Sequence, residues 1–257
     1  MSYSTWETFI TKWYHKRYSI QGWSNPQDTP LYNDNKKRES TIDYIPEPWW
    51  GNDGSTELHS VIINYNPGKA GPKQTRTKVP YKGSYAADIV IPPYLSDTAD
   101  WHERKRALPI LDALHDLGFI PSGYNLQNHL SIELIPWHTS SINGTGYWAY
   151  VKNNIKRIYE DVICFAASES KKISNSKLKG VVLLRMSEES FKRIKAYLTK
   201  MGITVTLKNP AKSEGKAKYV EYSITSLPDI RFILIWGAGI RNNMPNHADL
   251  KTIIASI

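Results

Sequence analysis

Four short apolar segments along the chain are separated by stretches with helical periodicity. The apolar segments are residues 61–63, 129–136, 179–185 and 231–236. Runs of this length are typical of strands that are covered on both faces in a parallel sheet. Because helical patterns lie between them, the chain has the strand–helix–strand rhythm of an α/β protein. The pattern therefore predicts an α/β fold with four parallel strands and helices on both faces of the sheet.

The helical pattern of residues 101–117 has an end signal and an interruption. Gly118 is well placed to cap the carboxyl end, since glycine readily adopts the left-handed conformation that ends many helices. Pro109 lies inside the pattern and predicts a kink or a break, because proline lacks the backbone N–H that the helix uses.

Two further helices and a hairpin are expected in the second half of the chain. A strong helical pattern covers residues 146–168. Ser187 is suited to cap a helix over 188–200, which has two glutamates in its first turn. Residues 204–207 and 219–224 predict a hairpin that is added to the sheet, with a basic loop between its strands.

The length of 257 residues suits a single domain over 1–257. An extension at 1–57 precedes the first core strand; its first 20 or so residues predict an amphipathic helix, and 24–57 are polar and irregular. Residues 69–100 have few periodic signals, and a loop of that length is usually functional or disordered. The sequence leaves open whether 24–57 and 69–100 are ordered.

The positive charge is concentrated in one part of the chain. The net charge is +9, and residues 151–220 contain 16 Lys/Arg against 6 Asp/Glu, a local excess of 16 − 6 = 10. Such asymmetry favours a polyanionic partner, through neutralisation of phosphates and release of counterions. The alternative is that these lysines cover solvated helix faces.

Several classes of protein are disfavoured by what the sequence lacks. The single cysteine, Cys164, excludes an intrachain disulfide and a cysteine zinc site, and the seven histidines lack the spacing of metal ligands. No Gly-x-Ser-x-Gly or phosphate-binding glycine motif is present. We therefore expect neither a metal nor a cofactor. The absence of a long apolar run and of a signal-like start leads us to expect an intracellular, cytoplasmic protein without a membrane partner. We also expect a monomer.

Three predicted strands end in polar turns. These turns are 64–68, 136–141 and 237–243, and all fall at the carboxyl edge of the predicted sheet. Ligands of open α/β sheets bind outside this edge. Pro67 and Gly68 make the first turn tight and allow close approach of a ligand to the backbone. Ordinary turns use the same residue types, so the composition alone does not establish a site.

The first of these turns carries a resemblance to a known family. Asn64-Tyr65-Asn66-Pro67-Gly68 resembles the first motif of the uracil-DNA glycosylase superfamily, especially its Gly-x-Asn-Pro-Gly form. The preceding Pro46-Glu47-Pro48-Trp49-Trp50-Gly51 looks like the lead-in of uncharacterised members with an Asn-x-Asn-Pro-Gly turn. The resemblance implies a three-layer α/β/α sandwich with a four-stranded parallel sheet over about residues 45–257. It also implies a protein that extrudes a base, modified or not, from DNA and hydrolyses or recognises it.

The catalytic roles that the resemblance implies fall on two residues. Asn66 would orient the attacking water, because an asparagine side chain cannot act as a base. The last motif of the family usually supplies a histidine that stabilises the departing base, but the corresponding stretch, 237–243, has none. Arg241 or the backbone amides of the glycines would supply the hydrogen-bond donors instead. Arg241-Asn242 resembles the Arg-Asn that follows this motif in the single-strand-selective branch.

The resemblance also implies residues that contact the base and the phosphates. Glu133 or His138 lies near the position that reads the base, and a glutamate there favours ligand donors such as an exocyclic amine over the mixed edge of uracil. Tyr65 and Trp137 are candidates for stacking. The expected base-binding set is Asn64, Tyr65, Gly68, Glu133, Trp137, His138, Gly237 and Asn242, and the expected phosphate contacts are Lys69, Lys73, Arg76 and Lys78, together with the basic surface of 151–220.

Two alternatives to an active glycosylase remain open. One is a non-catalytic nucleic-acid-binding protein on the same fold, which the missing histidine favours. The other is a hydrolase of small nucleosides or nucleotides. Binding to DNA should weaken steeply with salt, whereas turnover of a small ligand should respond little. The sequence leaves open which base is recognised and whether the DNA is single- or double-stranded.

Overall fold

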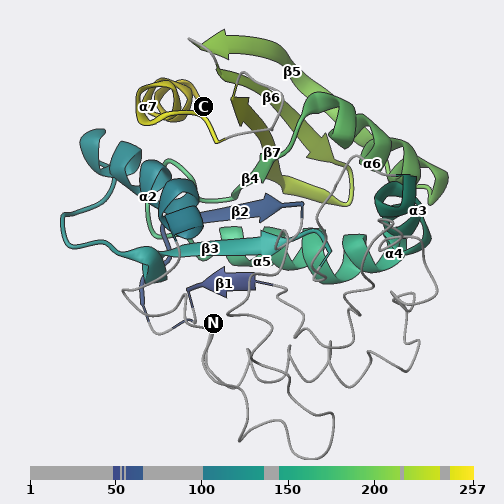
Figure 1. The fold of residues 1–257 in the computed structure, drawn as a ribbon, viewed down its shortest axis with the longest axis horizontal. Coiled ribbons are helices and arrows are strands. Elements are labelled where there is room, and N and C mark those ends of the chain that lie inside the picture. Colours follow the sequence, from purple (N-terminus) through teal and green to yellow (C-terminus); the bar gives the residue numbers. More distant parts are fainter. Residues whose placement is uncertain are drawn as a thin grey trace, which may run out of the picture.

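The computed structural model describes residues 49–52, 54, 56–65, 101–135, 145–214, 217–237 and 244–257, and everything below refers to these parts of the chain. They form an α/β structure around one mixed sheet of seven strands, in the order β1-β3-β2-β4-β7-β6-β5 (Figure 1). The strands are β1 (Trp49–Gly51), β2 (Ser60–Asn64), β3 (His129–Glu133), β4 (Val181–Arg185), β5 (Val205–Glu214), β6 (Ala217–Ile224) and β7 (Leu227–Gly237). The prediction of an α/β fold is confirmed.

The four predicted core strands lie side by side in the middle of this sheet. β3, β2, β4 and β7 pair in parallel, in that order. β1 adds an antiparallel strand to β3, and the antiparallel β5–β6 hairpin joins β7 on the other side. The sheet is therefore mixed and larger than the predicted four-stranded parallel sheet, because both of its edges are extended by antiparallel strands.

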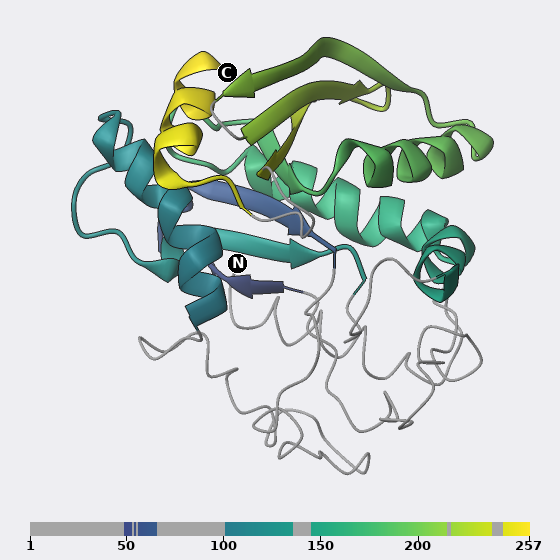
Figure 2. The same cartoon turned by 45° about the horizontal axis from the view of Figure 1, so that its top comes forward.

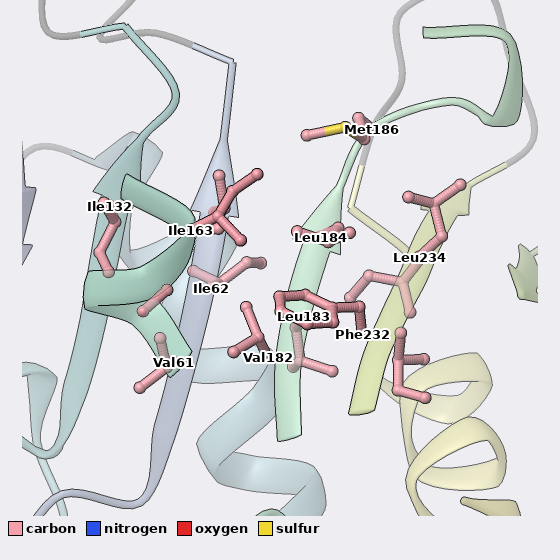
Figure 3. Close-up of a cluster of buried hydrophobic side chains, with 14 of the residues drawn as sticks. Val61, Ile62, Ile132, Ile163, Val182, Leu183, Leu184, Met186, Phe232 and Leu234 are labelled. Atoms are coloured by element: carbon pink, nitrogen blue, oxygen red, sulfur yellow. The ribbon is translucent and has the colours of Figure 1, made fainter. Parts of the chain in front are cut away.

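Helices flank the sheet (Figure 2). They are α2 (Trp101–Asp116), α3 (Thr145–Asn153), α4 (Ile155–Arg157), α5 (Cys164–Ser170), α6 (Glu188–Lys200) and α7 (His247–Ser256), with a 3-10 turn η6 (Leu126–Asn128) and a π-helical segment η7 (Ile158–Ile163). α2 and α7 pack against each other, and α5 contacts β2, β4 and β7. Buried side chains of the parallel strands and of Ile163 in η7 gather into one cluster (Figure 3). Burial of these apolar side chains is the main favourable term in folding.

The predicted helices that fall in the described parts of the chain are confirmed, with two differences. α2 runs through Pro109 without a break, and Gly118 follows it with φ of 74°. The N–H of Gly118 donates to the carbonyl of His115, as expected of a glycine that ends a helix. α6 begins and ends where predicted, and Ser187 Oγ accepts a hydrogen bond from the N–H of Ser190. The predicted helix at 146–168 is instead a succession of α3, α4, η7 and α5.

Two segments that were expected to be irregular or looped contain strands. β1 lies within the predicted irregular stretch 24–57, where Gly51 has φ of 98°. A Cβ on Gly51 would lie 2.0 Å from the carbonyl oxygen of His129, so only glycine allows this close pairing with β3. The predicted basic loop of the hairpin is mostly strand, because β5 and β6 stay paired as far as Glu214 and Ala217. The predicted N-terminal helix, residues 24–48 and residues 69–100 lie outside the described parts of the chain.

Candidate functional site

The carboxyl ends of the parallel strands bring two of the predicted site residues together. Asn64 is the last residue of β2 and Glu133 is the last residue of β3, and the parallel register places them directly opposite each other. β4 ends beside them at Arg185, and β7 ends at Gly237 on the far side of β4. Two of the predicted base-binding residues therefore meet, whereas Gly237 lies two strands away from Asn64. The predicted polar turn 136–141 lies outside the described parts of the chain. Arg185 was not predicted as a site residue, because it continues an apolar strand.

Asn64 is buried with one polar atom unpaired. Its side chain has no exposed surface, and its Nδ2 donates a hydrogen bond of 2.5 Å to Oγ of Ser131, which is also fully buried. Oδ1 of Asn64 accepts no hydrogen bond. A buried polar atom without a partner costs about 1–3 kcal/mol, so such atoms are rare in folded proteins and call for an explanation.

Glu133 lies in the same buried setting. Its side chain is only 2% exposed, although acidic side chains are seldom buried to this degree. Burial, with smaller contributions from Tyr65 and Glu133, raises the pKa of Tyr147 well above its usual value. The hydroxyl of Tyr147 donates to the backbone carbonyl of Tyr65 at 2.9 Å. Tyr147 therefore stays protonated and ties α3 to the end of β2.

Tyr65 is packed into the structure at this edge. Its hydroxyl accepts a hydrogen bond from the N–H of Ser187 at 2.9 Å, and its ring meets that of Tyr147 edge to face, with centroids 6.4 Å apart. The predicted stacking on a base would use a ring that is 6% exposed. Tyr65 thus lies at the candidate site and connects β2, α3 and α6, and its role in stacking stays a prediction.

The polar pair at the carboxyl end belongs to a longer row of buried polar residues. Because β2 and β3 are paired in register, Ser60, Asn64, His129, Ser131 and Glu133 occupy positions on one face of the sheet. Oγ of Ser60 and Nδ1 of His129 are hydrogen-bonded at 2.7 Å. Burial lowers the pKa of His129 to about 3, so this histidine is neutral at physiological pH. At the carboxyl end of the row, the hydrogen bond from Asn64 Nδ2 to Ser131 Oγ joins the same two strands.

Most helical lysines and arginines of the basic segment have acidic partners. Lys156, Lys192 and Arg193 each lie within 3.0 to 3.9 Å of a glutamate one helical turn away. This arrangement agrees with the alternative of a solvated helix face, and exposed pairs of this kind contribute little to stability. Among the described residues, the unbalanced charge is shared between the β5–β6 hairpin and other exposed lysines such as Lys152, Lys179 and Lys200.

The hairpin carries exposed lysines that make no ion pair among the described residues. These are Lys208, Lys212 and Lys218. β6 runs antiparallel to β7, with Ala217 opposite Gly237 and Lys218 opposite the half-buried Trp236. The tip of the hairpin therefore lies at the same edge of the sheet as the carboxyl ends of the parallel strands. The sequence pattern had placed these lysines in a basic segment but not at this edge.

The other predicted site residues lie outside the described parts of the chain. They are Asn66, Gly68, Lys69, Lys73, Arg76, Lys78, Trp137, His138, Arg241 and Asn242. Within the described residues, no group of three or more histidine, cysteine, aspartate or glutamate side chains is arranged to hold a metal ion. None of the helices in these parts of the chain has the length and apolar character needed to cross a bilayer.

The carboxyl edge carries the buried acceptor Oδ1 of Asn64 and the buried Glu133, and the hairpin tip with its lysines lies at the same edge, three strands from β2. These groups can accept hydrogen bonds and attract anions. Comparison with protein-family models, with curated proteins and with solved structures finds no match for this chain, so the candidate site is defined by its own geometry.

Proposed function

We propose that the protein is a uracil-DNA-glycosylase-like protein that binds an extruded base of DNA at the carboxyl edge of β2 and β3. The observation that carries the proposal is the unpaired Oδ1 of Asn64, buried opposite Glu133 at the end of two parallel strands. Ligands of α/β sheets bind at this edge. A bound base would supply the missing hydrogen bond, because the edges of bases carry N–H donors.

The arrangement of the strands supports the same proposal. Four parallel strands in a sheet flanked by helices are compatible with the α/β/α sandwich that the Asn64–Gly68 motif implies. A fold alone does not establish a function, so the proposal rests on the buried polar pair. Both side chains are buried, and a base reaches them only if the surrounding groups move. Exclusion of water from such a site strengthens each hydrogen bond made inside it.

The lysines of the hairpin would hold the DNA backbone. Lys212 and Lys218 are exposed and have no ion pair within the described ranges, and Trp236 lies opposite Lys218. Lysines beside an aromatic ring suit a single strand, because lysines neutralise phosphates and rings stack on bases. In this proposal the β5–β6 hairpin is the part of the predicted basic surface of 151–220 that reaches the carboxyl edge, with Lys69, Lys73, Arg76 and Lys78 as further contacts.

The proposed chemistry is the one that the resemblance implies. Asn66 would position a water molecule for attack on the sugar carbon, and Arg241 would stabilise negative charge on the departing base. Without the histidine of the last motif, recognition without hydrolysis is the second candidate function, and it uses the same site.

The test is release of a base from short oligonucleotides, single- and double-stranded, that contain uracil, hypoxanthine, xanthine or 5-hydroxymethyluracil at one position. Asn66→Ala and Arg241→Ala are measured in parallel, with Lys156→Ala as a variant away from the site. Release that disappears in Asn66→Ala supports a glycosylase. Salt-sensitive binding without release supports recognition alone. Absence of both on every substrate, including guanine-containing oligonucleotides, would remove DNA as the ligand.

A further inference from the structure

The hydrogen bond from Asn64 to Ser131 determines which atom of the amide is left for a ligand. Nδ2 points to Oγ of Ser131, two residues before Glu133 on β3, and the carbonyl oxygen is the atom without a partner. Ser131 itself is fully buried, so water cannot replace it as the partner of Nδ2. The amide is therefore held with its acceptor available.

The neighbour across the strand pair is an acceptor as well. Glu133 lies opposite Asn64 in the register and on the same face of the sheet. Glu133 enters this inference in its ionised form, and an ionised carboxylate accepts hydrogen bonds and donates none. Two acceptors at adjacent positions match a ligand edge with adjacent donors, and a ligand acceptor placed against either oxygen would be repelled and left unpaired.

The bases differ in which hydrogen-bond donors and acceptors lie next to each other on their edges. Uracil has a single N–H between two carbonyl oxygens, and adenine and cytosine each pair one amino group with a ring-nitrogen acceptor. Guanine has two adjacent donors, its ring N1–H and its exocyclic amino group, and oxidation at its C8 position leaves that edge intact. We propose that the Asn64–Glu133 pair selects a base with two adjacent N–H donors, such as guanine or its C8-oxidised form, and discriminates against uracil. This inference rests on the proposed binding of an extruded base.

In this inference Ser131 is a positioning residue, because it acts through Asn64 and does not touch the base. Its replacement by alanine removes the partner of Nδ2 and frees the amide to rotate. An amide that can present either its oxygen or its nitrogen no longer distinguishes a donor from an acceptor. The expected effect of Ser131→Ala is thus a loss of preference among bases, rather than a uniform loss of affinity.

The experiment measures binding to labelled duplexes with one unpaired guanine, 8-oxoguanine, adenine, cytosine or uracil opposite an abasic site, with a doubly abasic duplex as reference. The wild-type protein is expected to bind the guanine duplex at least about fivefold more tightly than the uracil duplex. This ratio is at the lower end of the discrimination that one bidentate contact to a base provides. Asn64→Leu and Ser131→Ala should reduce this ratio towards one. Ser60→Ala is the matched control, because Ser60 is an equally buried serine on the same face, hydrogen-bonded to His129 at the other end of the row.

The outcomes separate this inference from the proposed function. A guanine preference that is lost in Asn64→Leu and Ser131→Ala but retained in Ser60→Ala supports it. Equal binding of all bases, a preference for uracil, or a guanine preference that both site variants keep would overturn it and leave base recognition in place. Binding no stronger to any base than to the abasic reference would overturn the proposed function, and the selectivity with it.

Discussion

The hydroxyl of Tyr65, at the end of β2, accepts a hydrogen bond from the backbone N–H of Ser187, the residue that caps α6. Helix α6 follows β4 directly, so this contact ties the ends of two neighbouring parallel strands together. The hydroxyl of Tyr65 therefore helps to hold the carboxyl ends of β2 and β4 in a fixed arrangement.

Replacement of Tyr65 by phenylalanine should lower the free energy of unfolding by about 1–2 kcal/mol, because the ring is kept but the N–H of Ser187 loses its partner. Urea denaturation measures the change. Tyr159→Phe is the control, since its hydroxyl contacts the exposed Ser226 and its loss should matter less. An equal effect of the two substitutions would contradict this view of Tyr65.

The buried side chain of Asn64, with its unpaired Oδ1, should reduce the stability of the folded protein. In the double variant Asn64→Leu/Ser131→Ala, both partners of a buried hydrogen bond become apolar and the unpaired Oδ1 is removed, so stability should be unchanged or increase by about 1 kcal/mol. Base-dependent binding should be lost at the same time. Thermal unfolding together with the duplex-binding assay checks both expectations. A marked loss of stability would show that Asn64 has a structural role.

Gly51→Ala should be among the most destabilising glycine substitutions in the described part of the chain. Its Cβ would overlap the carbonyl oxygen of His129, and φ is positive, so we expect a loss of more than about 2 kcal/mol. Gly123→Ala is the matched control, because Gly123 has a similar φ of 91° with open space around it. It should show only the backbone strain, about 1–2 kcal/mol. Urea denaturation of both variants gives the comparison.

Stability should fall as the pH is lowered from about 6.5 towards 3. Burial depresses the pKa of His129 to about 3, below the value near 6.5 of the unfolded chain. The neutral form is thus favoured by folding; its contribution is fully present above pH 6.5 and is lost as the pH falls through this window. Burial also lowers the pKa of His59, which adds to the trend.

Urea midpoints at intervals between pH 7 and pH 4 measure this dependence, and His129→Gln should flatten it. If that variant does not fold, an NMR titration of the His129 ring in the wild-type protein gives the same information. A ring that titrates near pH 6.5 in the folded protein would contradict the prediction.

Removal of the hairpin lysines should change the salt dependence of DNA binding. For Lys212→Ala/Lys218→Ala, the slope of log Kd against log salt should decrease by about 0.7–0.9 for each phosphate contact that is lost. Lys156→Ala/Lys192→Ala removes the same charge from positions that are paired with glutamates. Its slope should stay close to that of the wild-type protein. Identical slopes for the two double variants would show that only net charge matters.

The local patterns of the sequence predicted much of the fold. Ser187 with two glutamates defined the start of α6, and Gly118 marked the end of α2, because these signals act through backbone groups nearby in the chain. β1 was missed because three residues have no periodicity, and its strand character comes from pairing with β3. The π-helical turn of η7 also has no signal of its own, since it depends on packing around residues 158–163.

The candidate site was predicted less completely than the fold. The polar turn after the first apolar strand indicated Asn64, and the family resemblance indicated Glu133, but their adjacency follows from a strand order that places β3 next to β2. Ser131 was not predicted, because a serine inside an apolar strand looks like an ordinary core position. The sequence showed the hairpin lysines only as part of the positive excess of residues 151–220. Their position near the carboxyl edge follows from the pairing of β6 with β7.

The row of buried polar residues also fixes the alignment of β2 with β3. Apolar side chains alone would allow the two strands to slide by two residues, since the same faces would still point inward. Such a slide would separate Ser60 from His129 and Asn64 from Ser131, and would leave several buried polar atoms without partners. These hydrogen bonds hold one end of the strand pair in position for a ligand. They also make every shifted pairing of β2 with β3 unfavourable during folding.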